Sequence, residues 1–447
     1  MGSSANEGTR LGDFVSLVRG TTYKSARLGE PGPALLGLAS IARDGGFRHD
    51  SLKTYGGESG KRLLLHPGDL YVSLKDVTQS GDLLGAVARV PGQVGLGRLT
   101  QDTVRLDFEG DPNWRRYVYW SLRAPEYRTY CRARAIGTTN LSLSREDFLD
   151  FKLPPLSPER QGLVDLLEGL DDKIELNRRM SRTLDEMAQA LFRSWFVDFQ
   201  RTQGILVQSE LGVIPVGWSV GCVGDIADII DCLHSKKPER QASGRLFLQL
   251  NNIKDDGLLD VSDTYLINDA DYRTWISRME ARQGDCVITN VGRSGAVAQI
   301  PWGLSAALGR NMTGIRLHAS FQYPTFLIEL LRSPAMKAEV SLKLDSGTIL
   351  DALNVRSIPR LRFVMPPAGL LTEFEQTARP IRCRMESLLE QSRSLVAVRD
   401  ALLPRLLSGM LKANGVRTTG TRCGGGDDGR TARSRPSSAS RESEVAS

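Results

Sequence analysis

Basic, amide and hydroxyl side chains gather in a few loops of this 447-residue chain, close to short apolar runs. Arg, Lys and Asn donate hydrogen bonds to phosphate, carbonyl and ring-nitrogen acceptors, and Arg and Asn can make two bonds at once. Such side chains recognise polar partners without breaking bonds. The candidates in the first half of the chain are Lys75, Asp76, Thr78, Arg98, Arg134, Thr138, Thr139 and Asn140. Those in the second half are Asn251, Asn252, Lys254, Asn290, Arg293, Arg310, Asn311, Ser346 and Thr348. For each one the alternative is a solvated turn or a cap.

Catalytic motifs are missing from the sequence. The segment Tyr55-Gly-Gly-Glu-Ser-Gly-Lys-Arg62 resembles a phosphate-binding loop, but it is one residue short. Arg62 also replaces the Ser or Thr that would hold magnesium. The four histidines are His49, His66, His234 and His318. No two of them have metal-ligand spacing, so we predict no metal site. We find no Asn-Pro-Pro-aromatic motif, glycine-rich cofactor fingerprint or acidic nuclease cluster, and we predict a non-catalytic chain.

Composition indicates a globular protein of two or three domains, with 40% apolar and 25% charged residues. Neither a membrane-spanning run nor an apolar leader segment occurs, which predicts a cytoplasmic protein without a membrane partner. The six cysteines are scattered, and we expect them to be reduced. Net charge is +6, but the low-complexity tail from Lys412 to Ser447 supplies half of it. Net charge is therefore weak evidence for a nucleic-acid partner.

The chain repeats itself with a period near 212 residues. Five sequence pairs recur in order: Gly12-Asp13 with Gly224-Asp225, Leu38–Ile41 with Leu250–Ile253, Asp44-Gly45 with Asp256-Gly257, Gly97-Arg98 with Gly309-Arg310, and Pro154-Pro155 with Pro366-Pro367. Each copy has short β-like runs, then a Pro-Pro break, then a long helical pattern. The repeat predicts two similar globular domains, each followed by a long helix.

Apolar residues recur every 3.5 residues in both helical segments, which predicts a coiled-coil seam. In the first segment the seam runs from Leu163 to Trp195, with a polar patch at Asn177 and Ser181. The second seam runs from Phe374 to Leu406. Pro380 interrupts it, which implies a kink or a late helix start, so we expect a regular helix mainly from Ile381 onward. The alternative is that each helix packs on its own domain.

Phe192, Trp195, Phe196 and Phe199 form one apolar face at the end of the first helical segment. We predict that this face is an exposed patch that binds another subunit. Packing of the same face within this chain is the alternative.

Two segments resemble the conserved helices of type I restriction–modification specificity subunits. The central one comprises Leu153–Gln161, Leu170–Met180 and Ala190–Phe199, and the second is Val398–Gly409. The resemblance covers about residues 9–411, and the tail lies outside the family plan. It implies an α+β protein in which an antiparallel two-helix coiled coil separates two similar α/β target-recognition domains. The expected parts are a first recognition domain at 1–155, a central helix at 156–200, a second recognition domain at 201–367, a C-terminal helix at 368–411 and a disordered tail at 412–447.

The resemblance further implies that the chain reads a bipartite double-stranded DNA target. It would bind two methyltransferase subunits and, optionally, nuclease–translocase subunits, and S-adenosylmethionine, ATP and Mg²⁺ would belong to those partners. The candidate loop residues would then contact phosphates and base edges. The loops differ between the copies, Ser73–Thr78 against Thr289–Arg293, so we predict an asymmetric target. The alternative function is a coiled-coil scaffold whose two globular domains bind proteins.

Overall fold

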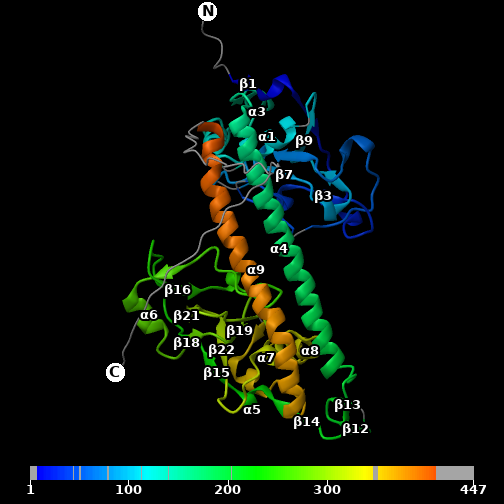
Figure 1. The fold of residues 1–447 in the computed structure, drawn as a ribbon, viewed down its shortest axis with the longest axis vertical. Coiled ribbons are helices and arrows are strands. Elements are labelled where there is room, and N and C mark those ends of the chain that lie inside the picture. The colour runs from blue at the N-terminus through cyan, green and yellow to red at the C-terminus, as the bar shows by residue number, and fades with distance from the viewer. Residues whose placement is uncertain are drawn as a thin grey trace, which may run out of the picture. The chain divides into compact units, whose positions relative to one another are not determined.

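The computed structural model describes residues 8–408, except 44, 50, 51, 78, 79, 112, 139, 203 and 346–350. Strands and short helices form two lobes, residues 9–153 and residues 206–365, and two long helices run beside them (Figure 1). The predicted tail at 412–447 lies outside the described residues. Among the described residues, no helix has the length and apolarity that a membrane span requires.

In its described residues the first lobe has two main sheets, together with the two-stranded pairs β1-β11 and β10-β6 and three α-helices. An antiparallel sheet has the order β2-β9-β5-β7, and a second sheet has the order β3-β8-β4, in which β3 is parallel to β8. Its strands are β1 (Thr9–Arg10), β2 (Val15–Arg19), β3 (Ala34–Leu36), β4 (Leu64–Leu65), β5 (Leu70–Ser73), β6 (Lys75–Asp76), β7 (Val87–Arg89), β8 (Gly97–Leu99), β9 (Thr103–Phe108), β10 (Leu141–Ser142) and β11 (Lys152–Leu153). The helices are α1 (Asn113–Ser121), α2 (Pro125–Ala133) and α3 (Arg145–Leu149).

The second lobe has the same plan. Its sheets have the orders β15-β22-β19-β20 and β17-β16-β21-β18, and β16 is parallel to β21. The strands are β12 (Leu206–Ser209), β13 (Gly212–Pro215), β14 (Ser219–Cys222), β15 (Ala227–Asp231), β16 (Arg245–Leu248), β17 (Leu266–Ile267), β18 (Glu280–Arg282), β19 (Cys286–Thr289), β20 (Val297–Gln299), β21 (Ser305–Leu308), β22 (Met312–Leu317), β23 (Leu344–Asp345), β24 (Ala352–Leu353) and β25 (Arg362–Met365). The helices are α5 (Val223–Ile226), α6 (Asp269–Trp275), α7 (Pro324–Arg332) and α8 (Pro334–Ser341).

Equivalent strands therefore recur in the two lobes, as the sequence repeat predicted. The repeat also explains one glycine pair, because Gly45 and Gly257 both have positive φ. A Cβ atom at Gly45 would lie 3.0 Å from Cγ of Arg123, and one at Gly257 would lie 2.6 Å from Cδ of Arg332. Each glycine therefore leaves room for an arginine of its own lobe, Arg123 in the turn between α1 and α2 and Arg332 at the end of α7.

One pairing inferred from the repeat is wrong. Leu36 pairs with Leu99 in the first lobe, and Leu248 pairs with Leu308 in the second. In this register the second-lobe residue that is structurally equivalent to Arg98 is Ala307, and the sequence repeat had matched Arg98 with Arg310. The segment between the paired strands is three residues shorter in the second lobe, because 62 residues separate Leu36 from Leu99 and 59 separate Leu248 from Leu308, and a fixed offset of 212 cannot follow that difference.

The two long helices are α4 (Pro158–Phe196) and α9 (Ala368–Ser408). Ser157 caps α4 by accepting a hydrogen bond from the backbone N–H of Arg160, and Pro158 fits the first turn because its missing N–H needs no partner there. In α9 the helix begins at Ala368 and continues through Pro380. The expected late start at Ile381 is therefore wrong, because packing against α4 and α7 holds the first three turns in place.

The long helices pack along each other in opposite directions (Figure 1). The Arg160 guanidinium donates to the Leu406 carbonyl over 3.1 Å, and Arg399 pairs with Asp171 at 2.8 Å. Near the middle, Nδ2 of Asn177 donates to Oε1 of Gln391 over 2.8 Å. As the residue number increases along α4, the number of its contact partner on α9 decreases. The two helices are therefore antiparallel. The residues of both predicted seams are buried or half-buried.

Each lobe is fixed to the helix pair by charged side chains that become largely buried. In the first lobe, Nη1 of Arg89 lies 2.7 Å from Oε2 of Glu168 on α4. In the second lobe, Arg332 makes two parallel bonds of 2.7 and 2.9 Å to Asp185 of α4. Arg382 of α9 donates to the carbonyls of Asp256 and Gly257. The first lobe is thus held near one end of α4 and the second lobe near the other.

Candidate nucleic-acid interface

The first-lobe candidates meet where β6 pairs with β10. The pairs are Lys75 with Ser142 and Asp76 with Leu141, so the loop at 137–140 lies next to β6. Lys75, Thr138 and Asn140 are exposed there. The Lys75 ammonium lies 3.5 Å from Asp102, a half-exposed pair that a stronger anion can displace. Thr78 and Thr139 lie outside the described residues.

Two first-lobe candidates are turned inward. Oδ2 of Asp76 accepts a 2.7 Å hydrogen bond from the backbone N–H of Leu83, and the residue is fully buried. Arg98 is 3% exposed, and it donates to the Leu99 carbonyl, to Oγ1 of Thr21 and to the Thr22 carbonyl. Both side chains hold loops in shape, so they do not occupy the exposed loop positions that we expected for them.

Arg134 remains on the surface just after α2. Its guanidinium stacks on the Tyr130 ring at 3.8 Å from the centroid and lies 3.6 Å from Asp147. The aromatic ring limits the positions that the arginine can adopt and leaves the outer edge of the guanidinium open to solvent. With Lys75, Thr138 and Asn140 it forms the first-lobe surface, a name kept below for these four residues.

The second-lobe candidates meet around the turn that follows β16. Nη1 of Arg293 donates to the Ile253 carbonyl over 2.8 Å, and the same guanidinium pairs with Asp255. This contact brings the loop after β19 against the segment that carries Asn251 and Lys254, both of which are exposed. Lys254 lies 3.3 Å from Asp260. The second-lobe surface is defined as Asn251, Lys254, Arg293 and Arg310.

Two asparagines of the second lobe have structural contacts instead. Oδ1 of Asn252 accepts from the Gln249 backbone, and its Nδ2 donates to the Asp260 carbonyl. Asn290 donates to the Leu353 carbonyl and accepts from the Thr313 hydroxyl. Both residues are buried, so they shape the turns and do not face solvent.

Arg310 and Asn311 lie on the turn between β21 and β22. Asn311 has φ of +64°, which favours Asn over most other residues. Its carbonyl accepts from the Asn290 backbone N–H, and Arg310 points into solvent as an exposed residue. Ser346 and Thr348 lie outside the described residues, although Val291 forms a bridge with Ala352 just beyond them.

The aromatic face at the end of α4 is inside the protein. Phe192, Trp195 and Phe196 are 6–8% exposed, and the Phe196 ring lies 4.9 Å from that of Phe374 on α9. Phe199 packs edge-on against Trp218 at 5.2 Å. These side chains help to fill the core of the second lobe, so they do not form the exposed patch that we expected. Their partners come from distant parts of the sequence, which periodicity within one helix cannot show.

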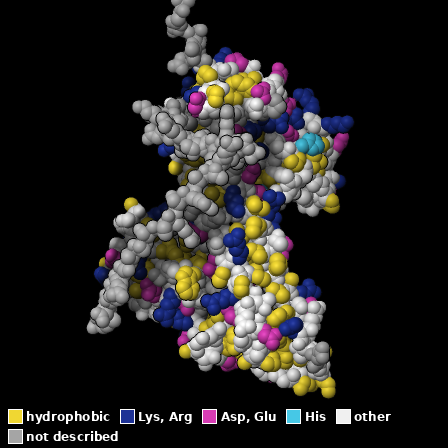
Figure 2. All heavy atoms as spheres, viewed as in Figure 1, with side chains coloured by type: hydrophobic (Ala, Val, Ile, Leu, Met, Phe, Trp, Pro, Cys, Tyr) yellow, Lys and Arg dark blue, Asp and Glu magenta, His cyan; other side chains and the backbone are white. Residues whose placement is uncertain are grey.

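An apolar surface that the sequence did not suggest lies on the β12–β13 hairpin. Its large exposed side chains are Ile205, Leu206, Val207, Val213 and Val216. Figure 2 shows apolar side chains at that end of the molecule, whereas basic and acidic side chains are mixed elsewhere on the same face. A cluster of exposed aliphatic residues of this kind is typical of a protein-binding surface.

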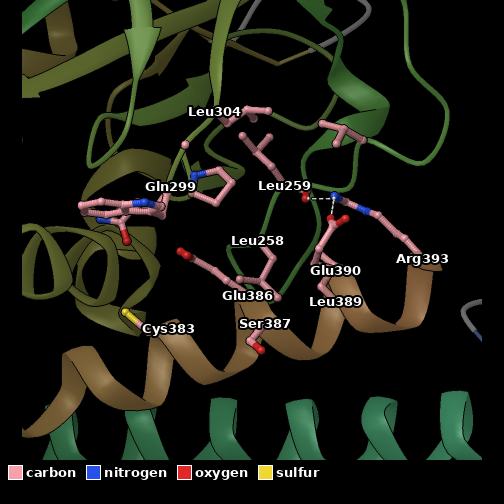
Figure 3. Close-up of a pocket in the computed structure, with 14 residues that line it drawn as sticks. Leu258, Leu259, Gln299, Leu304, Cys383, Glu386, Ser387, Leu389, Glu390 and Arg393 are labelled. Atoms are coloured by element: carbon pink, nitrogen blue, oxygen red, sulfur yellow. Dashed lines mark hydrogen bonds and ion pairs between the residues drawn. The ribbon is translucent and has the colours of Figure 1, made fainter. Parts of the chain in front are cut away.

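A pocket of about 470 Å³ lies between α9 and the second lobe (Figure 3). The lobe contributes apolar side chains, among them Leu258 and Leu304, while α9 contributes Glu386 and Glu390. Arg393 crosses its end and donates to the Leu259 carbonyl over 3.0 Å. This bond adds a further attachment of the second lobe to α9.

No protein-family model matches the chain. It is 24% identical over 307 residues to the type I restriction enzyme MjaIX specificity subunit of Methanocaldococcus jannaschii, a match that covers 66% of this chain and 69% of the relative. It is 22% identical over 318 residues to the type I restriction enzyme HindI specificity subunit of Haemophilus influenzae, covering 57% of this chain and 68% of that relative.

Among solved structures, the type I restriction–modification S subunit from M. genitalium superposes with a TM-score of 0.50. The superposition covers 90% of this chain and 96% of that one, at 14% identity, and it shows a shared fold. The fold class is thus a mixed helix-and-strand protein of the S-subunit type. The two sequence relatives confirm the resemblance to type I specificity subunits.

Proposed function

We propose that this chain is the DNA-binding specificity subunit of a type I restriction–modification complex. The observation that carries the proposal is the pair of lobes with one topology and different exposed loop residues, attached towards opposite ends of an antiparallel helix pair. Sequence similarity to specificity subunits over most of the chain supports it. Each lobe reads one half of a bipartite target, and the helix pair, packed as a coiled coil, sets the gap between the halves.

The first-lobe and second-lobe surfaces are the proposed points of contact with DNA. Lys75 and Arg134 would neutralise phosphates on one half-site, and Lys254 and Arg293 would do so on the other. Asn140 and Asn251 have the amide groups that pair with an adenine edge, and Arg310 has the fork that pairs with guanine. The two surfaces have different side chains, so we propose two different half-sites.

The chemistry of the complex belongs to its partners in this proposal. Two methyltransferase subunits would bind S-adenosylmethionine, and nuclease–translocase subunits, where present, would use ATP and Mg²⁺. The exposed aliphatic residues of the β12–β13 hairpin support a protein partner on this chain. Val213→Asp should weaken co-purification with the methyltransferase subunit. Gln208→Asp is the control, because it adds the same charge to the same hairpin at a residue that is already polar, and it should leave co-purification unchanged.

A gel-shift titration at graded salt separates DNA reading from the alternative of a protein scaffold. We expect sequence-selective binding in the presence of the methyltransferase, with a salt slope that grows by about 0.9 for each phosphate contact. Arg310→Ala should lose selectivity by about 1–3 kcal/mol at one base pair. Arg193→Ala, which removes an exposed arginine of α4 outside both surfaces, should change neither quantity. Salt-independent binding or binding without sequence preference would favour the scaffold.

A further inference from the structure

Asp231, Cys232 and His234 form a compact cluster at the end of β15. A carboxylate oxygen, the thiol sulfur and a ring nitrogen of these residues all lie within 4.8 Å of one another. Over the part of the chain that the structure describes, no other group of three such residues meets this spacing. Histidine spacing in the sequence does not reveal the cluster, because its other two members are not histidines.

The two carboxylate oxygens of Asp231 have different surroundings. Oδ2 lies 2.8 Å from Nε2 of His234 and 3.6 Å from Nη1 of Arg278. Oδ1 is buried and has no hydrogen-bond partner. A buried acceptor without a donor costs free energy, since it has lost its water and gained nothing in exchange. A cation beside Oδ1 would remove that cost.

We propose that Asp231, Cys232 and His234 bind a divalent cation of the zinc class, with water as a fourth ligand. Thiolate, imidazole and carboxylate are the ligands that Zn²⁺ takes in a tetrahedral site, where neighbouring ligand atoms lie about 3.3–3.6 Å apart. The cluster must close by roughly 1 Å, and the exposed His234 ring can supply that movement. On binding, the Cys232 thiol releases its proton to solvent, and the sulfur donates an electron pair to the metal.

Burial raises the pKa of the Cys232 thiol, so a metal must displace its proton, while the backbone amides of Met312 and Asn311 act in the opposite direction and favour a metal-bound thiolate. Nη1 of Arg278 donates to the Cys232 carbonyl over 2.9 Å and so remains beside Oδ2 of Asp231; its positive charge opposes a cation there, and the negative charges of the carboxylate and the thiolate must offset it. Because Asp231 pairs with Thr313, a bound metal would tie the end of β15 to the turn of Arg310 and Asn311.

Titration of the metal-stripped full chain with Co²⁺ tests the site, whether or not the chain binds DNA. We expect one Co²⁺ per chain, with a near-ultraviolet thiolate-to-cobalt charge-transfer band and the visible absorption of four-coordinate cobalt. Cys232→Ser should abolish the charge-transfer band. His234→Ala, a change at an exposed position that leaves the core intact, should weaken Co²⁺ binding at least about tenfold, the size that even an outer-sphere partner contributes.

His318→Ala is the matched control. His318 lies 3.4 Å from Asp228 near the start of the same strand, in a histidine–aspartate pair. Its loss should leave Co²⁺ binding and the band unchanged. The proposal is overturned if no charge-transfer band develops, or if the His234→Ala chain binds Co²⁺ as tightly as the natural one.

Discussion

Lengthening both long helices by one heptad should widen the gap between the two DNA half-sites. On α4 the first-lobe contacts extend to Arg178, which lies 2.9 Å from Nδ1 of His49, and the second-lobe contacts begin at Asp185. The bond between Asn177 and Gln391 places Arg179 opposite Leu389. We would therefore duplicate residues 173–179 in α4 and residues 383–389 in α9, at facing positions near the middle of the helix pair. The Arg393 contact with Leu259 is then lost, and the contacts of Arg332 and Arg382 keep the second lobe attached.

The expected size follows from helix geometry. Seven residues add about 10.5 Å at 1.5 Å per residue. They turn the helix about 20° short of two full turns, so the seams stay aligned. DNA rises about 3.4 Å per base pair, so the permitted gap should grow by about three base pairs. Both half-site sequences should be unchanged, because the exposed loop residues are not altered.

Mapping of methylated adenines across a host genome measures this gap directly. The host would carry the partner methyltransferase with either the natural or the lengthened chain. Duplication in α4 alone is the control. It moves the residues of α4 that follow the duplication one heptad out of register with α9, so the two helices can no longer pack along their whole length. Methylation should then be lost. A doubly lengthened chain that methylates sites with the original gap would refute the spacer role of the helix pair.

Three further changes test the packing of the helices and the lobes. Asn177→Leu should raise stability by about 1 kcal/mol in thermal unfolding, because it removes the buried unpaired Oδ1. It should also permit a wider range of gaps between the DNA half-sites in methylation mapping, because a polar residue in the seam fixes the register of the two helices. Arg382→Met should cost about 1–3 kcal/mol in denaturant unfolding, since it leaves the Asp256 and Gly257 carbonyls without their donor and removes one of the two arginines that pair with the buried Glu329. Arg384→Met at an exposed position of α9 should change stability by less than about 0.5 kcal/mol. Thiol labelling of the native chain at mildly alkaline pH should modify the exposed Cys383 well before Cys131, because burial raises the pKa of the Cys131 thiol to about 11; equal labelling rates at these two cysteines would contradict the packing of the first lobe.

The repeat and the helical seams could be predicted because both are written as periodic signals in one chain. The offset of 212 residues aligns β2 with β15 and the turn at Leu38 with that at Leu250. The seam from Leu163 to Trp195 is buried or half-buried throughout. Signals of this kind average over many residues, so single exceptions such as Pro380 do not remove them.

Individual loop residues could not be assigned in the same way. Arg98 and Arg134 look equivalent in the sequence, yet one is bonded inside the first lobe and the other stacks on a surface tyrosine. The burial of Asn290 depends on Thr313 and Leu353, which are distant in sequence. The ion pairs that attach the lobes, such as Arg332 with Asp185, likewise join charged residues that give no local signal.

Selection of bound duplexes from a random DNA library, with the natural chain and its methyltransferase partner, tests the central claim most directly. We expect a motif of two short conserved blocks with different sequences, separated by a gap of fixed length and no sequence preference. A single continuous motif, two identical blocks or a gap of variable length would contradict the reading of DNA by two distinct lobes on one rigid helix pair.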